Sequence, residues 1–173
     1  MKMFKRFAAA LLVGVMALAM LTACVDSTSK IGKEFEDKFV AVLNAARGEG
    51  VEALRNDDDL RTKALGQLYY VKDNGTIAEK NASDVIVLEK DKSGNPTKVV
   101  LVTVLPEDEN AVDGMYKVKE VTAEALGEIN SMWNDPDDQE AVKAIQKIGV
   151  ATRVINGKTY AAVAAEIPAS ALE

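Results

Sequence analysis

The stretch from Val99 to Leu105 is apolar at every position except Thr103. A strand with one face in water alternates apolar and polar residues, whereas a strand covered on both faces is apolar throughout. This run therefore predicts a central strand of a sheet, and the rest of the chain must provide elements that cover both of its faces.

Three pairs of short apolar segments flank turn sequences, and each pair predicts an antiparallel hairpin. The pairs are Leu68–Lys72 with Thr76–Lys80, Val85–Glu89 with Lys98–Leu105, and Thr152–Ile155 with Lys158–Ala165. The first and third turns contain Asn-Gly, the strongest short hairpin signal because both residues accept a positive φ. The last segment is rich in alanine, and we expect its small side chains to let a helix approach the sheet closely.

Apolar residues at helical spacing predict four helices. We expect a first helix from near Ser29 to a stop at Gly48 and Gly50, and a broken second region from Val51 to Gln67 that restarts at the N-cap Asp57. A third helix is capped by Thr122 and carries Leu126, Ile129, Met132 and Trp133 on its buried side. A fourth opens with Asp135 and Pro136, has an apolar face of Ala141, Val142, Ile145 and Ile148, and stops at Gly149.

The predicted order, α-α-β-β-β-β-α-α-β-β, is typical of the α+β class. We expect a single domain over 29–173, with a largely antiparallel sheet built from three hairpins and about four helices packed against it. The chain has one cysteine, so no disulfide forms within it and the apolar core alone must stabilise the domain.

The first 24 residues form a pattern of their own. Lys2, Lys5 and Arg6 precede the uncharged apolar stretch 8–20, which is shorter than the roughly 20 residues that a transmembrane helix needs. The sequence Leu21-Thr22-Ala23-Cys24 follows directly.

These four residues resemble the lipobox of bacterial lipoproteins, in which the cysteine sulfur receives a diacylglycerol and signal peptidase II cuts in front of it. The resemblance implies a signal peptide at 1–23, a lipid on Cys24 and a short tether at 24–28. The mature protein is then anchored to a bacterial membrane on its extracytoplasmic side.

The net charge of the chain limits which classes of partner it can bind. Removing the three basic residues of the leader from the chain's formal charge of −6 leaves −9. Anionic headgroups and nucleic acid repel so acidic a domain, so we expect no nucleic-acid partner and expect the lipid alone to hold the protein at the membrane.

The chain contains no histidine, which excludes catalytic triads, histidine general bases and histidine metal ligands. It also lacks a phosphate-binding glycine motif, and we expect no catalytic residues, cofactor or metal. Three acidic stretches, 57–59, 107–110 and 135–140, lack the spacing of a calcium loop. They keep one alternative open, a carboxylate-dependent hydrolase or a calcium-dependent binding protein.

The leading hypothesis is a membrane-anchored, non-catalytic binding or accessory module of the cell envelope. We expect its partner to be another envelope protein that meets an exposed sheet edge or a tyrosine-bearing face. Tyr69, Tyr70 and Tyr160 are the candidate contact residues, whereas the helical spacing of Trp133 predicts a core position.

Overall fold

The computed structural model describes residues 27–107, 110–129 and 136–172. Its helices are α2 (Ser27–Arg47), α3 (Asp58–Leu68), α4 (Ala123–Glu128) and α5 (Pro136–Lys143). Its strands are β1 (Thr76–Ala78), β2 (Ser83–Lys90), β3 (Pro96–Val104), β4 (Met115–Lys117), β5 (Lys147–Ile155) and β6 (Lys158–Pro168). Two 3₁₀ turns, η2 (Glu79–Asn81) and η4 (Ala169–Leu172), complete the elements. The predicted α+β class is confirmed.

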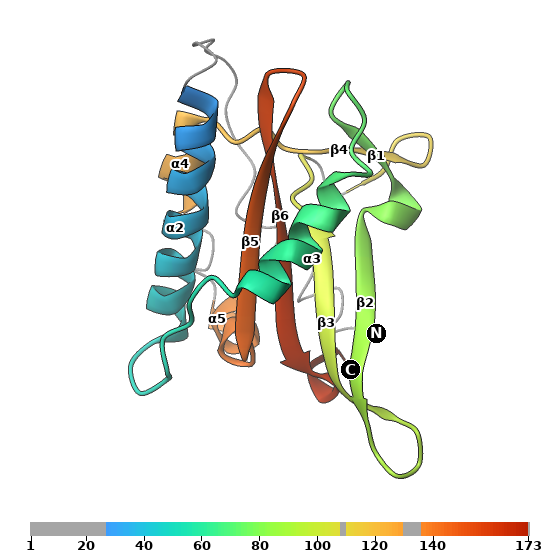
Figure 1. Ribbon diagram of the computed structural model, residues 1–173. Helices are drawn as coiled ribbons and strands as arrows, with labels where there is room; N and C mark the ends of the chain where they lie inside the picture. Colours follow the sequence, from blue (N-terminus) through green and yellow to red (C-terminus); the bar gives the residue numbers. More distant parts are fainter. Residues whose placement is uncertain (1–26, 108–109, 130–135, 173) are drawn as a thin grey trace.

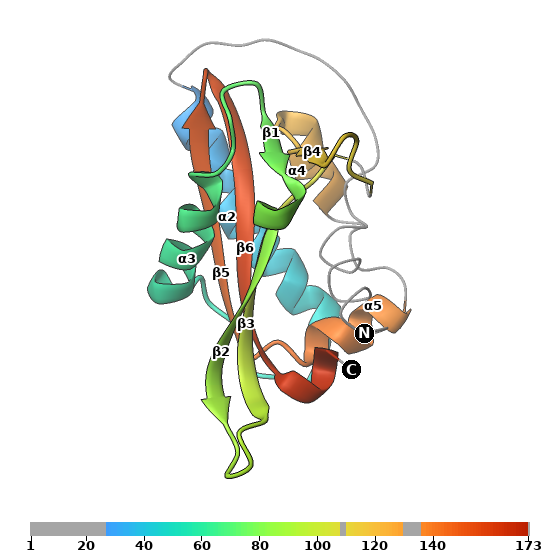
Figure 2. The same ribbon diagram turned by 90° about the vertical axis from the view of Figure 1, so that its right-hand side faces the viewer.

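Four strands form the main sheet in the order β2-β3-β6-β5, with every neighbouring pair antiparallel. Helix α3 lies on one face of this sheet, and α2, α4 and α5 lie on the other (Figures 1 and 2). In β3, Val99 and Leu101 pack into the core with α2, while Val100 and Val102 pack into the core with α3. The prediction of a central strand covered on both faces is therefore confirmed.

The alanines of β6 let α3 pack closely on the sheet. Ala162 and Ala164 lie fully buried in the cluster that contains α3, and Ala161 and Ala165 lie in the cluster that contains α2. Beside them in β5, a Cβ built on Gly149 would lie 2.2 Å from the backbone nitrogen of Arg61 in α3. The backbone of the helix thus rests directly on the strand.

Two of the three predicted hairpins are present. Strands β2 and β3 pair across the 91–95 loop, and β5 pairs with β6 across Asn156 and Gly157, whose φ angles are 51° and 79°. Both strands of the last hairpin are longer than predicted, because β5 begins at Lys147 and β6 ends at Pro168.

The predicted first hairpin is wrong. A tight turn does form at Asn74 and Gly75, closed by the Lys72 N–H donating to the Thr76 carbonyl at 2.8 Å. Leu68, however, is fully buried as the last residue of α3, so no strand precedes this turn. Strand β1 pairs instead with β4, which follows a two-residue Asp113-Gly114 turn that the sequence analysis missed.

The helix predictions are partly confirmed. Helix α2 ends at Arg47, before Gly48 at a φ of 78°, and begins at Ser27, slightly earlier than predicted. Asp57 caps α3 by accepting from the Leu60 N–H at 3.0 Å, and Thr122 caps α4 by accepting from the Ala125 N–H at 3.2 Å.

Two helix boundaries differ from prediction. The segment 51–55 is not helical, because the chain there crosses from α2 towards the edge of β5. Helix α5 ends at Lys143 and not at Gly149, because Ile148 and Gly149 belong to β5. There Ile148 packs into the core with α2, and Gly149 lies against the backbone of α3. Met132, Trp133 and Asp135 lie outside the described residues.

Candidate interaction edge

The four-stranded sheet has two edge strands, β2 and β5. In an antiparallel strand, residues alternate between those that bond to the neighbouring strand and those that point their backbone groups the other way. On β2 the Val104 N–H donates to the Ala82 carbonyl at 3.0 Å, so, within the regular register, Ala82 and every second residue after it bond to β3. Ser83, Val85 and Val87 therefore direct their backbone N–H and C=O groups away from the sheet.

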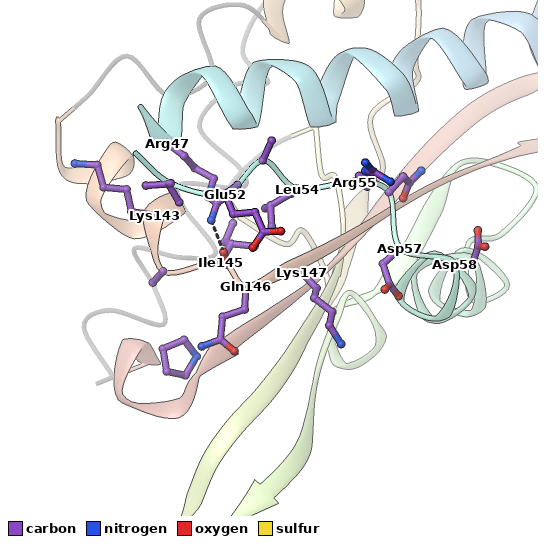
Figure 3. Close-up of a pocket in the computed structure, with 15 residues that line it drawn as sticks. Arg47, Glu52, Leu54, Arg55, Asp57, Asp58, Lys143, Ile145, Gln146 and Lys147 are labelled. Atoms are coloured by element: carbon purple, nitrogen blue, oxygen red, sulfur yellow. Dashed lines mark hydrogen bonds between the residues drawn. The ribbon is translucent and has the colours of Figure 1, made fainter. Parts of the chain in front are cut away.

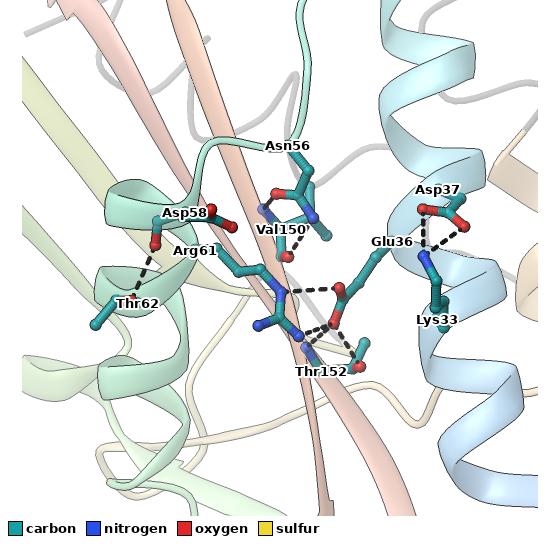
Figure 4. Close-up of polar contacts among 9 residues, drawn as sticks. All are labelled: Lys33, Glu36, Asp37, Asn56, Asp58, Arg61, Thr62, Val150 and Thr152. Atoms are coloured by element: carbon teal, nitrogen blue, oxygen red, sulfur yellow. Dashed lines mark hydrogen bonds and ion pairs between the residues drawn. The ribbon is translucent and has the colours of Figure 1, made fainter.

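Outward backbone groups of β5, in contrast, have partners from other elements; Figure 4 shows those at Val150 and Thr152. The carbonyl of Ile148 accepts from the Asp57 N–H at 2.8 Å. Val150 donates to the Asn56 Oδ1 at 2.8 Å and accepts from its Nδ2 at 3.0 Å. The N–H of Thr152 donates to the Glu36 Oε1 at 2.9 Å. At three successive outward positions of this edge, residues from α2 or from the segment before α3 thus bond one or both of the backbone groups.

Glu36 is the centre of this closure. It is only 6% exposed, and besides the Thr152 N–H it accepts from the Thr152 hydroxyl at 2.8 Å. The Arg61 guanidinium donates to both carboxylate oxygens, at 3.0 and 3.2 Å, and this hydrogen bond raises the pKa of Arg61. The carboxylate joins α2, α3 and β5, so it serves the fold and is not available for general acid or base chemistry.

The outer edge of β2 is open by comparison. Among the residues that the structure describes, the only hydrogen bond to an outward backbone group here runs from the Val85 N–H to the Asp84 Oδ1, at 2.8 Å. The side chains of Val85, Val87 and Leu88 are 37%, 42% and 42% exposed. An exposed strand edge with apolar side chains is a template for another strand.

Several features of β2 limit indiscriminate pairing. The register with β3 shifts at Leu88, and such irregularities twist an edge away from other chains. Asp84, Glu89 and Lys90 place charges along the strand, which disfavour association with an arbitrary apolar segment. The edge is therefore open but selective.

The structure places the three predicted tyrosines in two different environments. Tyr69 and Tyr70 follow the end of α3 and are 65% and 57% exposed, and the Arg153 guanidinium of β5 lies 4.2 Å from the centre of the Tyr69 ring. Tyr160 is buried, with its hydroxyl against Gly75, and burial raises the pKa of this phenol. Two of the three are thus at the surface, with Tyr69 against Arg153 of β5, and the third belongs to the core.

A groove of about 1520 Å³ lies between the end of α2, the 51–58 segment and the start of β5 (Figure 3). Arg47 at its wall is buried and donates to the backbone carbonyls of Glu52 and Ile145 at 2.6 and 3.0 Å, and burial lowers the pKa of this guanidinium. Lys143 lies at one end of the groove and Asp57 and Asp58 at the other (Figure 3). Arg47 fastens two chain segments to the end of α2, and the charged side chains around it do not converge on one point.

The three acidic stretches are only partly within the residues that the structure describes. Asp57 is the cap of α3, and no group of three or more acids that could hold a metal ion occurs within the described ranges. Asp108, Glu109 and Asp135 lie outside these ranges, as do residues 1–26, which include Cys24. None of the helices in the described ranges is both long enough and apolar enough to span a bilayer.

No family model matches the chain, and no curated protein or solved structure matches it either.

Proposed function

We propose that this chain is an exported lipoprotein, held to the membrane by a lipid on Cys24, that acts as a non-catalytic binding module of the cell envelope. Its binding element is the outer edge of β2, which takes up an extended segment of another envelope protein. The observation that carries this proposal is that three successive outward positions are capped on β5, whereas β2 has one such bond, made by its own Asp84.

Strand addition would use the groups that β2 leaves exposed. The N–H and C=O groups of Ser83, Val85 and Val87 would each gain a backbone partner, and each such bond contributes about 0.5–1.5 kcal/mol net. Val85 and Val87 lie opposite Leu101 and Val99 in the register, so they share one face and can contact alternate side chains of the added strand. Few such contacts are available, so we expect binding that is specific but reversible.

The anchor compensates for this modest affinity. Helix α2 begins at Ser27, and an extended chain covers at most about 3.3–3.6 Å per residue, so a lipid on Cys24 would hold the domain within a short distance of the bilayer. Tethering raises the effective concentration of the edge relative to a partner in the same membrane. Proteins in or close to that membrane are therefore the partners that the proposal favours.

The alternative, a carboxylate-dependent hydrolase or a calcium-dependent binder, requires several acids that converge in a cleft. Two of the described acids have structural roles instead: Asp57 caps α3, and Glu36 forms an ion pair with Arg61. No observation favours the alternative over a binding module.

Site-specific photocross-linking in cells tests the proposal. A photoreactive residue replaces Val87 on β2 or, as the matched control, Val154 on β5; the two side chains are 42% and 47% exposed. We expect a discrete adduct with an envelope protein from position 87 and none from position 154, and a much weaker adduct when Cys24→Ser removes the anchor. Equal adducts from both positions, or none from position 87, would contradict the proposal.

A further inference from the structure

The chemistry of β2 also indicates what kind of segment it accepts, an inference that rests on the proposed function. We infer that the added strand carries a lysine or arginine opposite Asp84 and apolar side chains opposite Val85 and Val87.

Asp84 is an exposed carboxylate whose present partner lies on its own strand. Its Oδ1 accepts from the Val85 N–H at 2.8 Å, and it takes part in no ion pair with any described residue. An added strand needs the Val85 N–H for its own carbonyl. Binding therefore releases the Asp84 carboxylate beside the new strand, where it requires another donor. A cationic side chain opposite supplies that donor and an opposite charge.

The second acid of β2 does not create the same requirement. Glu89 lies opposite Lys98 in the register, and its carboxylate is 3.2 Å from the Lys98 Nζ. That hydrogen bond raises the pKa of Lys98, which stays charged and also lies 3.5 Å from Glu166. Glu89 already has its cation within the sheet, so Asp84 is the acid on this strand that selects the partner's charge.

The side chains on the other face of β2 indicate where the added strand should carry apolar residues. Val85 and Val87 are two residues apart on the face opposite Asp84, and both are more than a third exposed. Apolar side chains at alternate positions of the added strand would cover them. The expected pattern is two apolar residues separated by one residue, with a basic residue adjacent to the one that faces Val85.

A second copy of the chain matches this pattern poorly. In an antiparallel pairing of two β2 strands, Lys90 of one copy would stand opposite Asp84 of the other only in the register centred on Val87. That register includes Leu88, where the strand leaves regular geometry. The acidic net charge of the chain also opposes self-association and attracts basic segments.

The test uses the purified full-length protein and two synthetic peptides, Thr-Val-Thr-Val-Lys-Thr and the same peptide with Glu in place of Lys. Binding is measured by titration, and its location by hydrogen exchange at the amides of Val85 and Val87. We expect the Lys peptide to bind about three- to tenfold more tightly than the Glu peptide. Asp84→Asn should remove this preference and Asp84→Lys should reverse it. Glu49→Lys, which makes the same charge change as Asp84→Lys in an exposed loop, should leave it intact.

The outcomes separate the inference from the proposed function. If both peptides bind equally well and slow exchange at Val87, the edge binds strands but the charge preference is wrong. If neither peptide binds or slows exchange, the proposed function itself is overturned. If sedimentation shows a dimer whose Val87 amide is protected without peptide, the occupant is a second copy and not a basic segment.

Discussion

The two edge strands of the main sheet, β2 and β5, both have backbone N–H and C=O groups that point away from the sheet. The two strands differ in what these groups bond to. At β5, the outward backbone groups bond to Asn56 and Glu36, which are 94 and 116 positions away in the sequence. At β2, the outward N–H of Val85 bonds only to the adjacent Asp84. The fold therefore contains long-range caps for a strand edge but uses them on one edge alone. The remaining edge, β2, is the one at which we propose that a partner strand adds.

The largest expected effect comes from forcing α3 away from the closed edge. In Gly149→Ala, the new Cβ would lie 2.2 Å from backbone atoms of Leu60 and Arg61, and neither can move without shifting the helix. We expect a loss of about 3 kcal/mol in the free energy of unfolding, at the upper end of what overpacking costs.

A matched glycine provides the control for this experiment. Gly66 lies in the exposed part of α3 with no atom within 4 Å of a built Cβ, so Gly66→Ala should stabilise the protein by about 0.5–1 kcal/mol. Both variants are compared by urea denaturation. A Gly149→Ala protein as stable as the wild type would show that α3 does not rest on β5.

The next largest effect is expected when Glu36, which bonds to Thr152 at the β5 edge, is replaced. Glu36→Ala deletes the acceptor of Arg61 and of the Thr152 N–H and hydroxyl. We expect a loss of about 2–3 kcal/mol, less than for a fully buried pair because Arg61 is partly exposed and can be hydrated. Glu34→Ala, on an exposed turn of the same helix, should change the stability by less than about 0.5 kcal/mol. If both variants lost the same free energy of unfolding, the bonds of Glu36 to Arg61 and Thr152 would not contribute to stability as described.

A smaller effect is expected at Asn56. Its side chain satisfies both backbone groups of Val150, so Asn56→Ala should cost about 1–2 kcal/mol and speed hydrogen exchange at Val150. The amide of Val87 on the other edge should exchange at an unchanged rate. Unchanged exchange at Val150 would mean that this cap does not close the edge.

The smallest effect concerns the loop that joins β2 to β3. Asp91 accepts from the N–H groups of Asn95 and Ser93, at 2.9 and 2.8 Å, and these bonds lower its pKa. Its stabilising contribution is therefore present above the ordinary aspartate pKa of about 3.9 and is lost as the pH falls through the lower folded value. NMR amide shifts of Ser93 and Asn95 should follow that titration in the wild type and not in Asp91→Ala, while Val150 stays unchanged. If the amide shift of Asn95 instead changed with a midpoint at the ordinary aspartate pKa, the lowered pKa of Asp91 would be contradicted.

Sequence patterns predicted the elements that depend on local chemistry. The caps Asp57 and Thr122, the stop after Arg47 and the Asn156-Gly157 turn need only residues near in sequence, and they were predicted correctly. The buried strand 99–105 and the alanines of β6 were also identified, because full burial leaves a compositional pattern.

The errors arose where distant contacts override local preference. Ile148 and Gly149 fit the end of a helix by spacing, yet they belong to β5 because Gly149 alone allows the approach of α3. Leu68 fits a strand before an Asn-Gly turn but lies buried in α3. The open edge was expected only in general terms, since which edge is open depends on Asn56 and Glu36 reaching β5 across the fold.

Residue-resolved hydrogen exchange on the isolated protein is the most direct test of the contrast between the two edges. The outward amide of Val87 should exchange in the fastest class of strand amides, whereas those of Val150 and Thr152, bonded to Asn56 and Glu36, should be protected by orders of magnitude. If Val87 is as well protected as Val150 and Thr152, the β2 edge is closed in the free protein and strand addition there is contradicted.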